Sequence, residues 1–246
     1  DDYYNPSAHT YYYNGGASAN HAVTLVGWDD NLLVPGAPGR GAWLIKNSWG
    51  ESWGDNGYFW LSYADRRGGN EGFCFYDAVP PSTYQAVYYH DDFGCVGSWN
   101  IPYGLNAFTA TSDQDLMAVQ FWTMADSATY TLRVYDTFAA GQMSGMYAEV
   151  SGTCTYAGAH TVDLPSPVHL AAGNDFYLYL HITNGGDYPL AADWAASGYS
   201  PSSRASPGQS YYSMDGSTWA DFTTVMSTAN FCIKGLVTTT TPPEIV

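Results

Sequence analysis

In the first part of the chain, apolar and β-branched residues form two short runs separated by a polar loop. The runs occupy residues 20–28 and 42–48, and the loop between them is rich in Asp, Pro and Gly. This pattern predicts a β-hairpin, followed by a tight turn and a third strand that ends near Tyr63. If the hairpin is symmetric about its loop, Val23 lies opposite Ile45.

The same register places two further pairs across the hairpin. Leu25 lies opposite Trp43, and His21 lies opposite Asn47 with the Cβ atoms roughly 5 Å apart. An Asn carbonyl can accept a hydrogen from one ring nitrogen of a histidine, which fixes the tautomer and leaves the other nitrogen to serve a nucleophile. His21 and Asn47 are therefore the predicted catalytic residues.

After the Val-Pro-Pro sequence at residues 79–81 the pattern changes. Short strand-like runs of period near two alternate with turn signals, and almost no stretch has a helical stripe. Such spacing predicts a β-sandwich, of jelly-roll type. The runs are QAVYYH, NAFTA, LMAVQFWT, TYTLRVY, HTVDL, DFYLYLHI, QSYYSM and NFCIKGLV. We therefore expect a mainly β chain with a first domain over 1–79, a sandwich over 80–237 and a Thr/Pro linker or tail over 238–246.

Two motifs in the first domain, NHAV and KNSWGESWGDNGY, carry a family resemblance. In this order they resemble the histidine and asparagine segments of papain-like cysteine peptidases, and the likeness covers about residues 1–79. It implies that His21 pairs with a cysteine thiolate, that Asn47 orients the imidazole, and that Trp49 shields the His–Asn bond, with Trp53 as the second indole. The alternative is a buried sheet histidine with a local Asn partner.

The chain departs from this family at the nucleophile. In the family the nucleophilic cysteine and an oxyanion-hole glutamine precede the histidine, but the residues before His21 contain neither Cys nor Gln. We therefore expect the N-terminal helical half of the fold to be absent and the chain alone to be inactive. The expected partners are a protein or peptide substrate and an N-terminal Cys-bearing fragment.

The second domain resembles the lectin-like domain that follows the catalytic domain in some secreted prokaryotic papain-like enzymes. VYYHDDFG, NAFTA, GAHTVDLPSPVHLAAGNDF, GQSYYSMDGSTWADF and ANFCIKGL carry the likeness. A cell-surface glycan is therefore a candidate partner, and a binding or adhesion module with a vestigial peptidase half is the alternative function. Sugar stacking needs exposed aromatic rings, and sandwich core is the commoner fate of such residues. The candidates by residue type are Trp99, Trp194, Tyr211, Tyr212 and Trp219.

Hydrolysis by a thiol requires no cofactor. Calcium is a candidate ligand of the sandwich, because hard oxygen donors in loops can bind it, although no EF-hand spacing is present. The aspartates in expected loops are Asp91, Asp92, Asp113, Asp115 and Asp215.

The acidic charge of the chain makes nucleic acid and anionic membranes unfavourable partners. The chain has 23 Asp+Glu against 7 Lys+Arg, for a formal charge of −16. This disfavours nucleic acid and anionic membrane surfaces, which are bound through clustered Lys or Arg. No apolar run approaches the ~20 residues of a membrane-spanning helix. Low charge with many Tyr, Thr, Ser and Gly suits an extracellular or cell-surface β protein.

The four cysteines are Cys74, Cys95, Cys154 and Cys232. The segment FCFYDAV around Cys74 resembles the closing strand of the peptidase β half. FGCVGSW around Cys95 echoes the family's nucleophile segment, but it follows the histidine and lacks a helical pattern, so we expect no nucleophile there. We expect a disulfide within the sandwich, among its three cysteines.

Overall fold

The computed structural model describes residues 2–70, 72–185 and 189–239. It divides into two compact units, Asp1–Ala78 and Val79–Val246. The described residues are almost entirely strands and turns, with one short 3-10 helix, η1 (Phe222–Thr224), which confirms the predicted mainly β class. Among these residues, no helix has the length and apolar character needed to span a membrane. Most of the expected Thr/Pro tail, residues 240–246, lies outside the described residues.

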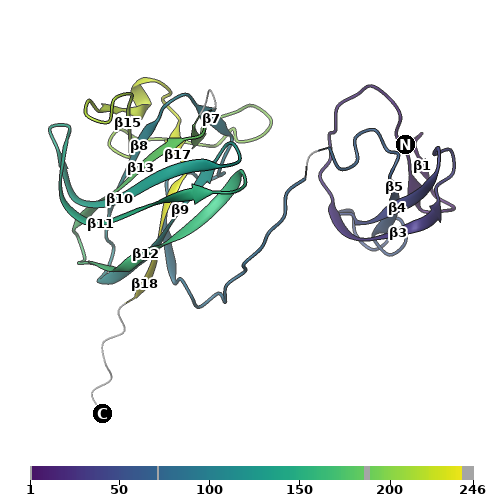
Figure 1. The fold of residues 1–246 in the computed structure, drawn as a ribbon, viewed down its shortest axis with the longest axis horizontal. Coiled ribbons are helices and arrows are strands. Elements are labelled where there is room, and N and C mark those ends of the chain that lie inside the picture. Colours follow the sequence, from purple (N-terminus) through teal and green to yellow (C-terminus); the bar gives the residue numbers. More distant parts are fainter. Residues whose placement is uncertain (1, 71, 186–188, 240–246) are drawn as a thin grey trace, which may run out of the picture. The chain divides into compact units, whose positions relative to one another are not determined.

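A five-stranded sheet forms the first unit (Figure 1). Its order is β1-β2-β5-β4-β3, so the long strand β3 lies at one edge. β2 and β5 are parallel, and the other neighbours are antiparallel. The strands are β1 (Tyr4–Asn5), β2 (Thr10–Tyr11), β3 (Thr24–Leu33), β4 (Arg40–Lys46) and β5 (Tyr58–Ser62).

The predicted hairpin exists, but its predicted register is wrong. Leu25 pairs with Ile45, and Trp28 pairs with Trp43. The register shifts between Leu25 and Gly27, where β3 carries an extra residue. A second shift lies between Asp29 and Leu33, nearer the loop. The loop is therefore centred later in the sequence than the symmetric prediction assumed, and the bulge after Leu25 only partly offsets that displacement. The observed partner of Ile45, Leu25, lies two residues from the predicted partner, Val23. Side chains along a strand alternate between the two faces of the sheet, so Leu25 lies on the same face as Val23.

The segment FCFYDAV is not the closing strand that we expected. Residues 72–85 form no strand, and the side chains of Phe73 and Phe75 are 83% and 94% exposed. A strand needs a neighbour for its backbone groups, and none of the described strands pairs with this segment.

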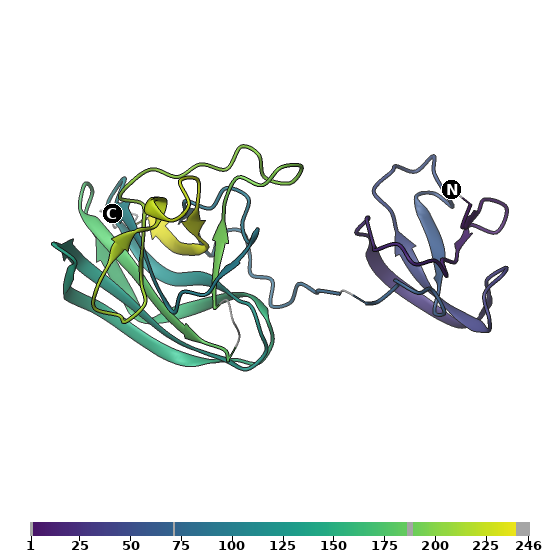
Figure 2. The same ribbon diagram turned by 90° about the horizontal axis from the view of Figure 1, so that it is seen from above.

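Three sheets make up the second unit (Figure 2). The largest has the order β11-β10-β13-β8-β15-β16, the second β12-β9-β18-β6, and the smallest β17-β14-β7. The predicted sandwich is thus present, and every run that we predicted lies on a strand. The strands are β6 (Ala86–Tyr88), β7 (Gly97–Trp99), β8 (Tyr103–Thr109), β9 (Gln114–Thr123), β10 (Ala128–Ala139), β11 (Gln142–Cys154), β12 (Gly158–Leu170), β13 (Asp175–Thr183), β14 (Leu190–Asp193), β15 (Ser210–Ser213), β16 (Ala220–Asp221), β17 (Asn230–Phe231) and β18 (Ile233–Thr239).

Alternation along the strands builds the sandwich core. On β13, Phe176, Leu178, Leu180 and Ile182 are almost completely buried. They join one apolar cluster with side chains of the four-stranded sheet, including Phe121. Burying side chains of this size contributes about 1.5–3 kcal/mol each, so this cluster is the main source of the unit's stability.

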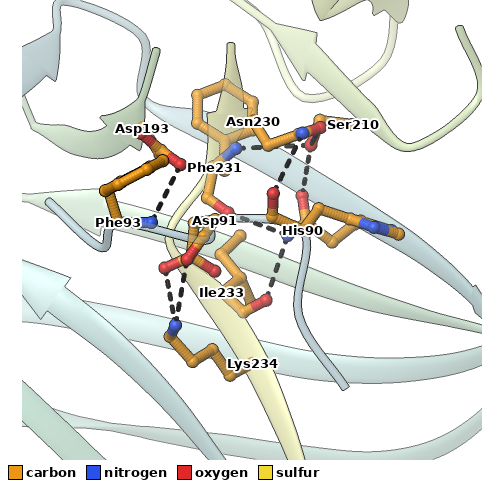
Figure 3. A network of polar contacts seen from close by, with 10 residues as sticks. His90, Asp91, Phe93, Asp193, Ser210, Asn230, Phe231, Ile233 and Lys234 are labelled. Carbon is orange, nitrogen blue, oxygen red and sulfur yellow. Dashed lines mark hydrogen bonds and ion pairs between the residues drawn. The ribbon is translucent and has the colours of Figure 1, made fainter. Parts of the chain in front are cut away.

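Buried hydrogen bonds tie the largest sheet to the smallest sheet and to β18 of the four-stranded sheet (Figure 3). The Asn106 side chain donates to the carbonyls of Phe231 and Ile233 at 2.9 and 3.0 Å. The Ser210 hydroxyl contacts the side-chain oxygens of Asn106 and Asn230 at 2.7 and 3.0 Å. These polar groups are buried, so their mutual contacts replace the water that they lose on folding.

An ion pair lies in the same region (Figure 3). Nζ of Lys234 lies 2.8 Å from a carboxylate oxygen of the fully buried Asp91. Burial raises the pKa of Asp91, and the nearby ammonium opposes that rise. Close by, the buried Asp193 accepts a hydrogen bond from the backbone of Phe93 at 3.2 Å. The pair fixes the segment after β6 to β18.

Candidate catalytic site

The structure brings the two predicted catalytic side chains together. Nε2 of His21 lies 2.9 Å from Oδ1 of Asn47. Asn47 directly follows β4, and its backbone N–H donates to the carbonyl of Gly57 at 2.9 Å. His21 lies three residues before β3. The contact therefore joins the residues that flank the open end of the hairpin, and His21 and Asn47 are not a pair of opposed strand residues as predicted.

The surroundings of Asn47 fix the tautomer of the histidine. Asn47 is 8% exposed, and its Oδ1 also accepts the backbone N–H of Ser48 at 2.8 Å. The backbone N–H of Ser48 can only donate, which identifies the Asn47 atom as the amide oxygen. Since an oxygen can only accept here, Nε2 of neutral His21 carries the proton and Nδ1 has the free lone pair. His21 is exposed, so Nδ1 is available to a nucleophile.

Stacked and perpendicular aromatic rings hold the histidine in place. The His21 ring stacks on Trp49 with centroids 5.2 Å apart and planes at 22°. Trp49 meets Trp53 edge to face at 5.0 Å, and Trp53 stacks on Tyr4 at 4.8 Å. Trp49 therefore covers one face of the imidazole as the family resemblance implies, although its own side chain is 54% exposed.

The turn between Asn47 and β5 depends on glycine. Gly54 has φ +64°, and a Cβ there would lie 2.4 Å from the carbonyl oxygen of Tyr58. That approach is too close for any side chain, so only glycine lets this turn close. The closed turn positions the Trp53 ring beneath Trp49 and, through it, the imidazole.

No thiol of the chain contacts His21 among the described residues. Cys74 is exposed and lies in the strand-free segment after β5. Cys95 lies in the second unit, where burial first and then the negative charge of Asp91 raise its pKa. An activated nucleophile needs the opposite shift, toward the thiolate. Cys95 thus lacks the environment of a nucleophile.

The expected disulfide within the sandwich is absent, because all four cysteines are free. Cys95 contacts the carbonyl of Gly97 and the sulfur of Met124, whereas Cys154 packs in the apolar core at the end of β11. Cys232, between β17 and β18, is buried, and its pKa is raised well above the usual value, chiefly by desolvation. The sequence could not exclude the bridge because distances between strands do not follow from an even count of cysteines.

The candidate sugar-stacking residues divide into two groups. Trp99, Trp194 and Tyr212 are partly buried and pack against the sandwich core. Tyr211 and Trp219 instead lie beside Phe138, with ring centroids at 4.8 and 6.1 Å. This second group lies outside the core cluster, although its rings are also half-buried.

The candidate calcium ligands do not converge. No group of three or more His, Cys, Asp or Glu side chains within the described part of the chain is placed to hold a metal ion. Asp91 faces Lys234, Asp115 lies 3.1 Å from the ring of His169, and Asp215 accepts the backbone N–H groups of Ser217 and Thr218. Calcium binding stays a prediction without an assigned site.

Comparison with known proteins assigns both regions. Residues 87–237 match the model of the lectin-like domain, and residues 3–75 match that of the papain family cysteine protease. Cathepsin J of Mus musculus is 43% identical over 60 residues, which are 24% of this chain and 16% of the relative. The oryzain gamma chain of Oryza sativa subsp. japonica is 58% identical over 40 residues, 16% of this chain and 9% of the relative. The chain thus spans only a small part of these relatives.

Two solved structures match both units. A clostridial cysteine protease, Cwp84 after propeptide cleavage, is similar with a TM-score of 0.80 and 26% identity, over 97% of this chain and 63% of that one. The cysteine protease and lectin-like domains of Cwp84, a surface layer associated protein of Clostridium difficile, match with a TM-score of 0.77 and 26% identity, over 97% and 56% of the two chains. The chain therefore belongs to the lectin-like domain family through residues 87–237, and its residues 3–75 are similar to papain family cysteine proteases.

Proposed function

We propose that this chain takes part in peptide-bond hydrolysis as the histidine- and asparagine-bearing part of a cysteine peptidase. The observation that carries the proposal is the 2.9 Å contact between Nε2 of His21 and Oδ1 of Asn47. The nucleophile is a cysteine outside residues 1–246, on a missing or separate N-terminal part. The chain alone is inactive, because no cysteine among its described residues contacts the imidazole.

The chemistry follows from the tautomer. Nδ1 of His21 accepts the proton of the external thiol, and the thiolate attacks the carbonyl carbon of a peptide bond. His21 then protonates the leaving amine, and water, with His21 as base, cleaves the thioester. Asn47 takes no proton. It keeps the imidazole plane in place, so that one ring nitrogen faces the reacting atoms throughout.

The exposed apolar surface of the first unit supports an external partner. Leu25 and Val26 on the edge strand β3 are 53% and 49% exposed. An edge strand with unpaired backbone groups and apolar side chains favours the addition of another strand or chain. We assign this surface to the fragment that carries the cysteine, because β3 begins next to His21.

A thiol-specific label tests the proposal. Native material is treated with substoichiometric iodoacetamide and mapped by peptide mass spectrometry. The fast-reacting cysteine is expected outside residues 1–246, and its labelling rate is expected to fall at least tenfold in a His21→Ala variant. Fast labelling of Cys74 that depends on His21 would refute the external nucleophile. If Cys74 is labelled at the same rate in the native protein and in His21→Ala, its labelling reflects only the exposure of Cys74.

The second candidate function is attachment to a glycan on a cell surface. The half-buried aromatic cluster formed by Phe138, Tyr211 and Trp219 favours it, since partly accessible rings outside a core can stack on sugar rings. Binding of the chain to a polysaccharide array, lost in Trp219→Ala and retained in Trp194→Phe, supports this function, and equal binding by both variants argues against it. Either function places the protein outside the cell or at its surface.

A further inference from the structure

An open cavity of about 340 Å³ lies on the sheet of the first unit and is lined by Trp28, Asp30, Trp43 and Tyr63. Three neighbouring strands or their ends supply these side chains: β3, β4 and the residue after β5. Trp28 and Trp43 are direct cross-strand partners. The catalytic motifs do not account for this group, and the proposed hydrolysis does not use it.

A glycine gives the cavity its shape. Gly41 has φ +101°, and a Cβ there would lie 2.2 Å from the Tyr63 ring. The ring therefore lies directly against the backbone of β4 and beside Trp43, with centroids 4.4 Å apart and planes at 48°. Any other residue at position 41 would push Tyr63 away from the cavity.

A carboxylate is fixed at the same place. The Tyr63 hydroxyl donates to Oδ1 of Asp30 at 2.8 Å. Desolvation, the bond to Asp30 and the nearby charge of Asp29 raise the pKa of Tyr63 to about 12, so the hydroxyl keeps its proton and its bond at neutral pH. This bond uses one carboxylate oxygen and leaves Oδ2 as an acceptor for another group.

Aromatic faces beside a negative charge attract cations. A cation within about 6 Å of a Trp or Tyr ring is drawn to the electron-rich face. The carboxylate adds Coulombic attraction and repels anions, in a chain with a formal charge of −16. The Trp28 side chain is 66% exposed, so this wall of the cavity is open to a ligand from solvent.

We propose that this cavity, lined by Trp28, Asp30, Trp43 and Tyr63, binds the cationic side chain of a lysine or arginine from another polypeptide. The ammonium or guanidinium group lies against the indole rings and donates an N–H to Oδ2 of Asp30. A quaternary ammonium group has the charge but no N–H, so it lacks this bond. The carboxylate therefore selects for the side chains of a basic peptide.

The position of the cavity separates its role from catalysis. Trp28 follows His21 by seven residues, which corresponds to roughly 20 Å of extended chain. A peptide residue held there lies several residues away from a bond next to the imidazole, so the cavity acts as a remote anchor. Binding needs no nucleophile and is measurable on the 246-residue chain even if the proposed hydrolysis is wrong.

The test is a titration followed by NMR on the complete ¹⁵N-labelled chain at constant ionic strength. The probes are Nα-acetyl-lysine amide and Nα-acetyl-arginine amide, with the uncharged Nα-acetyl-norleucine amide as control. We expect saturable shifts of the indole N–H signals of Trp28 and Trp43 with both cationic probes and none with norleucine. Absence of saturable shifts with the cationic probes would overturn the proposal.

Two pairs of variants locate the binding energy. Trp28→Ala is expected to weaken binding about fivefold or more, the value of one cation–π contact, with partial recovery in Trp28→Phe. Asp30→Asn is expected to weaken it similarly, whereas Asp29→Asn, at the neighbouring acid that does not line the cavity, changes it little. If Asp30→Asn and Asp29→Asn weaken binding equally, the effect comes from the overall charge of the chain, and the proposed site is wrong.

Tetramethylammonium chloride decides the ligand class. It carries the same charge as the lysine probe but donates no hydrogen bond. If tetramethylammonium binds more weakly than the lysine probe, the ligand is a basic side chain. If the two probes bind equally to Asp30→Asn, the hydrogen bond to the carboxylate causes the difference in affinity. Tighter binding than lysine would assign the cavity to a quaternary ammonium ligand and contradict the proposal.

Discussion

The two units of this chain differ in how completely they bury their apolar residues. The second unit holds one continuous core cluster, from Ile101 to Val237, between its sheets. In the first unit the buried apolar side chains are Val34, Ala42, Ile45 and Phe59, while Leu25, Trp28 and Leu33 on β3 are more than half exposed. The second unit contains its own core, whereas the first unit leaves large apolar side chains of β3 exposed.

The same contrast applies to the polar groups. The Asp91–Lys234 pair is enclosed and holds two distant segments together, which is a structural role. The His21–Asn47 pair is fixed on the asparagine side and exposed on the histidine side. His21 is therefore exposed and pre-oriented beside the apolar edge strand β3. This arrangement agrees with the proposal that the nucleophile comes from outside residues 1–246.

The largest expected effect is in the sandwich core. Phe176→Ala removes a fully buried ring that stacks with Phe108. It is expected to lower the unfolding free energy of the second unit by about 3–5 kcal/mol, because the surrounding sheets cannot close the cavity. Urea denaturation followed by near-UV circular dichroism measures the change. A loss below about 1 kcal/mol would show that the unit lacks the rigid core described above.

Removing the buried cation is expected to have the next largest effect. Lys234→Met leaves the Asp91 carboxylate enclosed without a counter-charge, and should cost about 2–4 kcal/mol, less than a fully buried pair because the lysine side chain is 18% exposed. Denaturation of the variant and of Lys234→Arg, which keeps the charge, provides the comparison. Equal losses in both variants would attribute the effect to packing.

The same carboxylate makes a prediction for pH. Burial raises the folded-state pKa of Asp91 above its unfolded value, so the folded state binds the proton more tightly. The unfolding free energy contributed by this group is therefore highest below the unfolded pKa, about 4, and falls as pH rises through the folded pKa. Asp91→Asn should remove this component, and Asp92→Asn, at the exposed neighbour, should preserve it. A pH profile unchanged by Asp91→Asn would contradict the assignment.

A matched pair of residues tests the exposure of β3 directly. Ile45 and Leu25 are opposite one another across the hairpin, but they are 3% and 53% exposed. Ile45→Ala is expected to cost about 2–3 kcal/mol in the chain alone, and Leu25→Ala less than about 0.5 kcal/mol. Hydrogen exchange of the β4 amides measures both. If Leu25→Ala costs as much as Ile45→Ala, the edge is already covered within this chain.

The smallest effect is spectroscopic. Asn47→Ala removes the acceptor that holds the proton on Nε2 of His21, so the neutral imidazole should become a mixture of tautomers. The ¹⁵N shifts of the ring report this, and Asn47→Asp, which keeps an acceptor, should retain the Nε2–H form. Identical ring shifts in all three proteins would show that Asn47 does not set the tautomer.

Local sequence patterns and motifs predicted many of the strands and the two catalytic candidates. They did not predict strand register or contacts between residues far apart in the sequence. The period-two runs located the sandwich strands, and the ordered NHAV and NSWG motifs located His21 and Asn47. The strand β11 was missed because its Gly, Ser and Met residues have weak strand propensity. The predicted register was wrong because the irregularities of β3, above all the one between Asp29 and Leu33 near the loop, leave no sequence signal. The Asp91–Lys234 pair joins residues far apart in sequence, and the Trp28 cavity depends on that same register, so neither could be foreseen.

We propose that these 246 residues supply an oriented histidine to a thiol on a missing or separate N-terminal part. The most direct measurement is thiol-dependent cleavage of a fluorogenic protein substrate by the pure chain, with and without a separately produced Cys-bearing fragment of its native protein. We predict no cleavage by the chain alone, cleavage when the fragment is added, and loss of that cleavage in His21→Ala. Cleavage by the chain alone that disappears in Cys74→Ser or Cys95→Ser would contradict the claim.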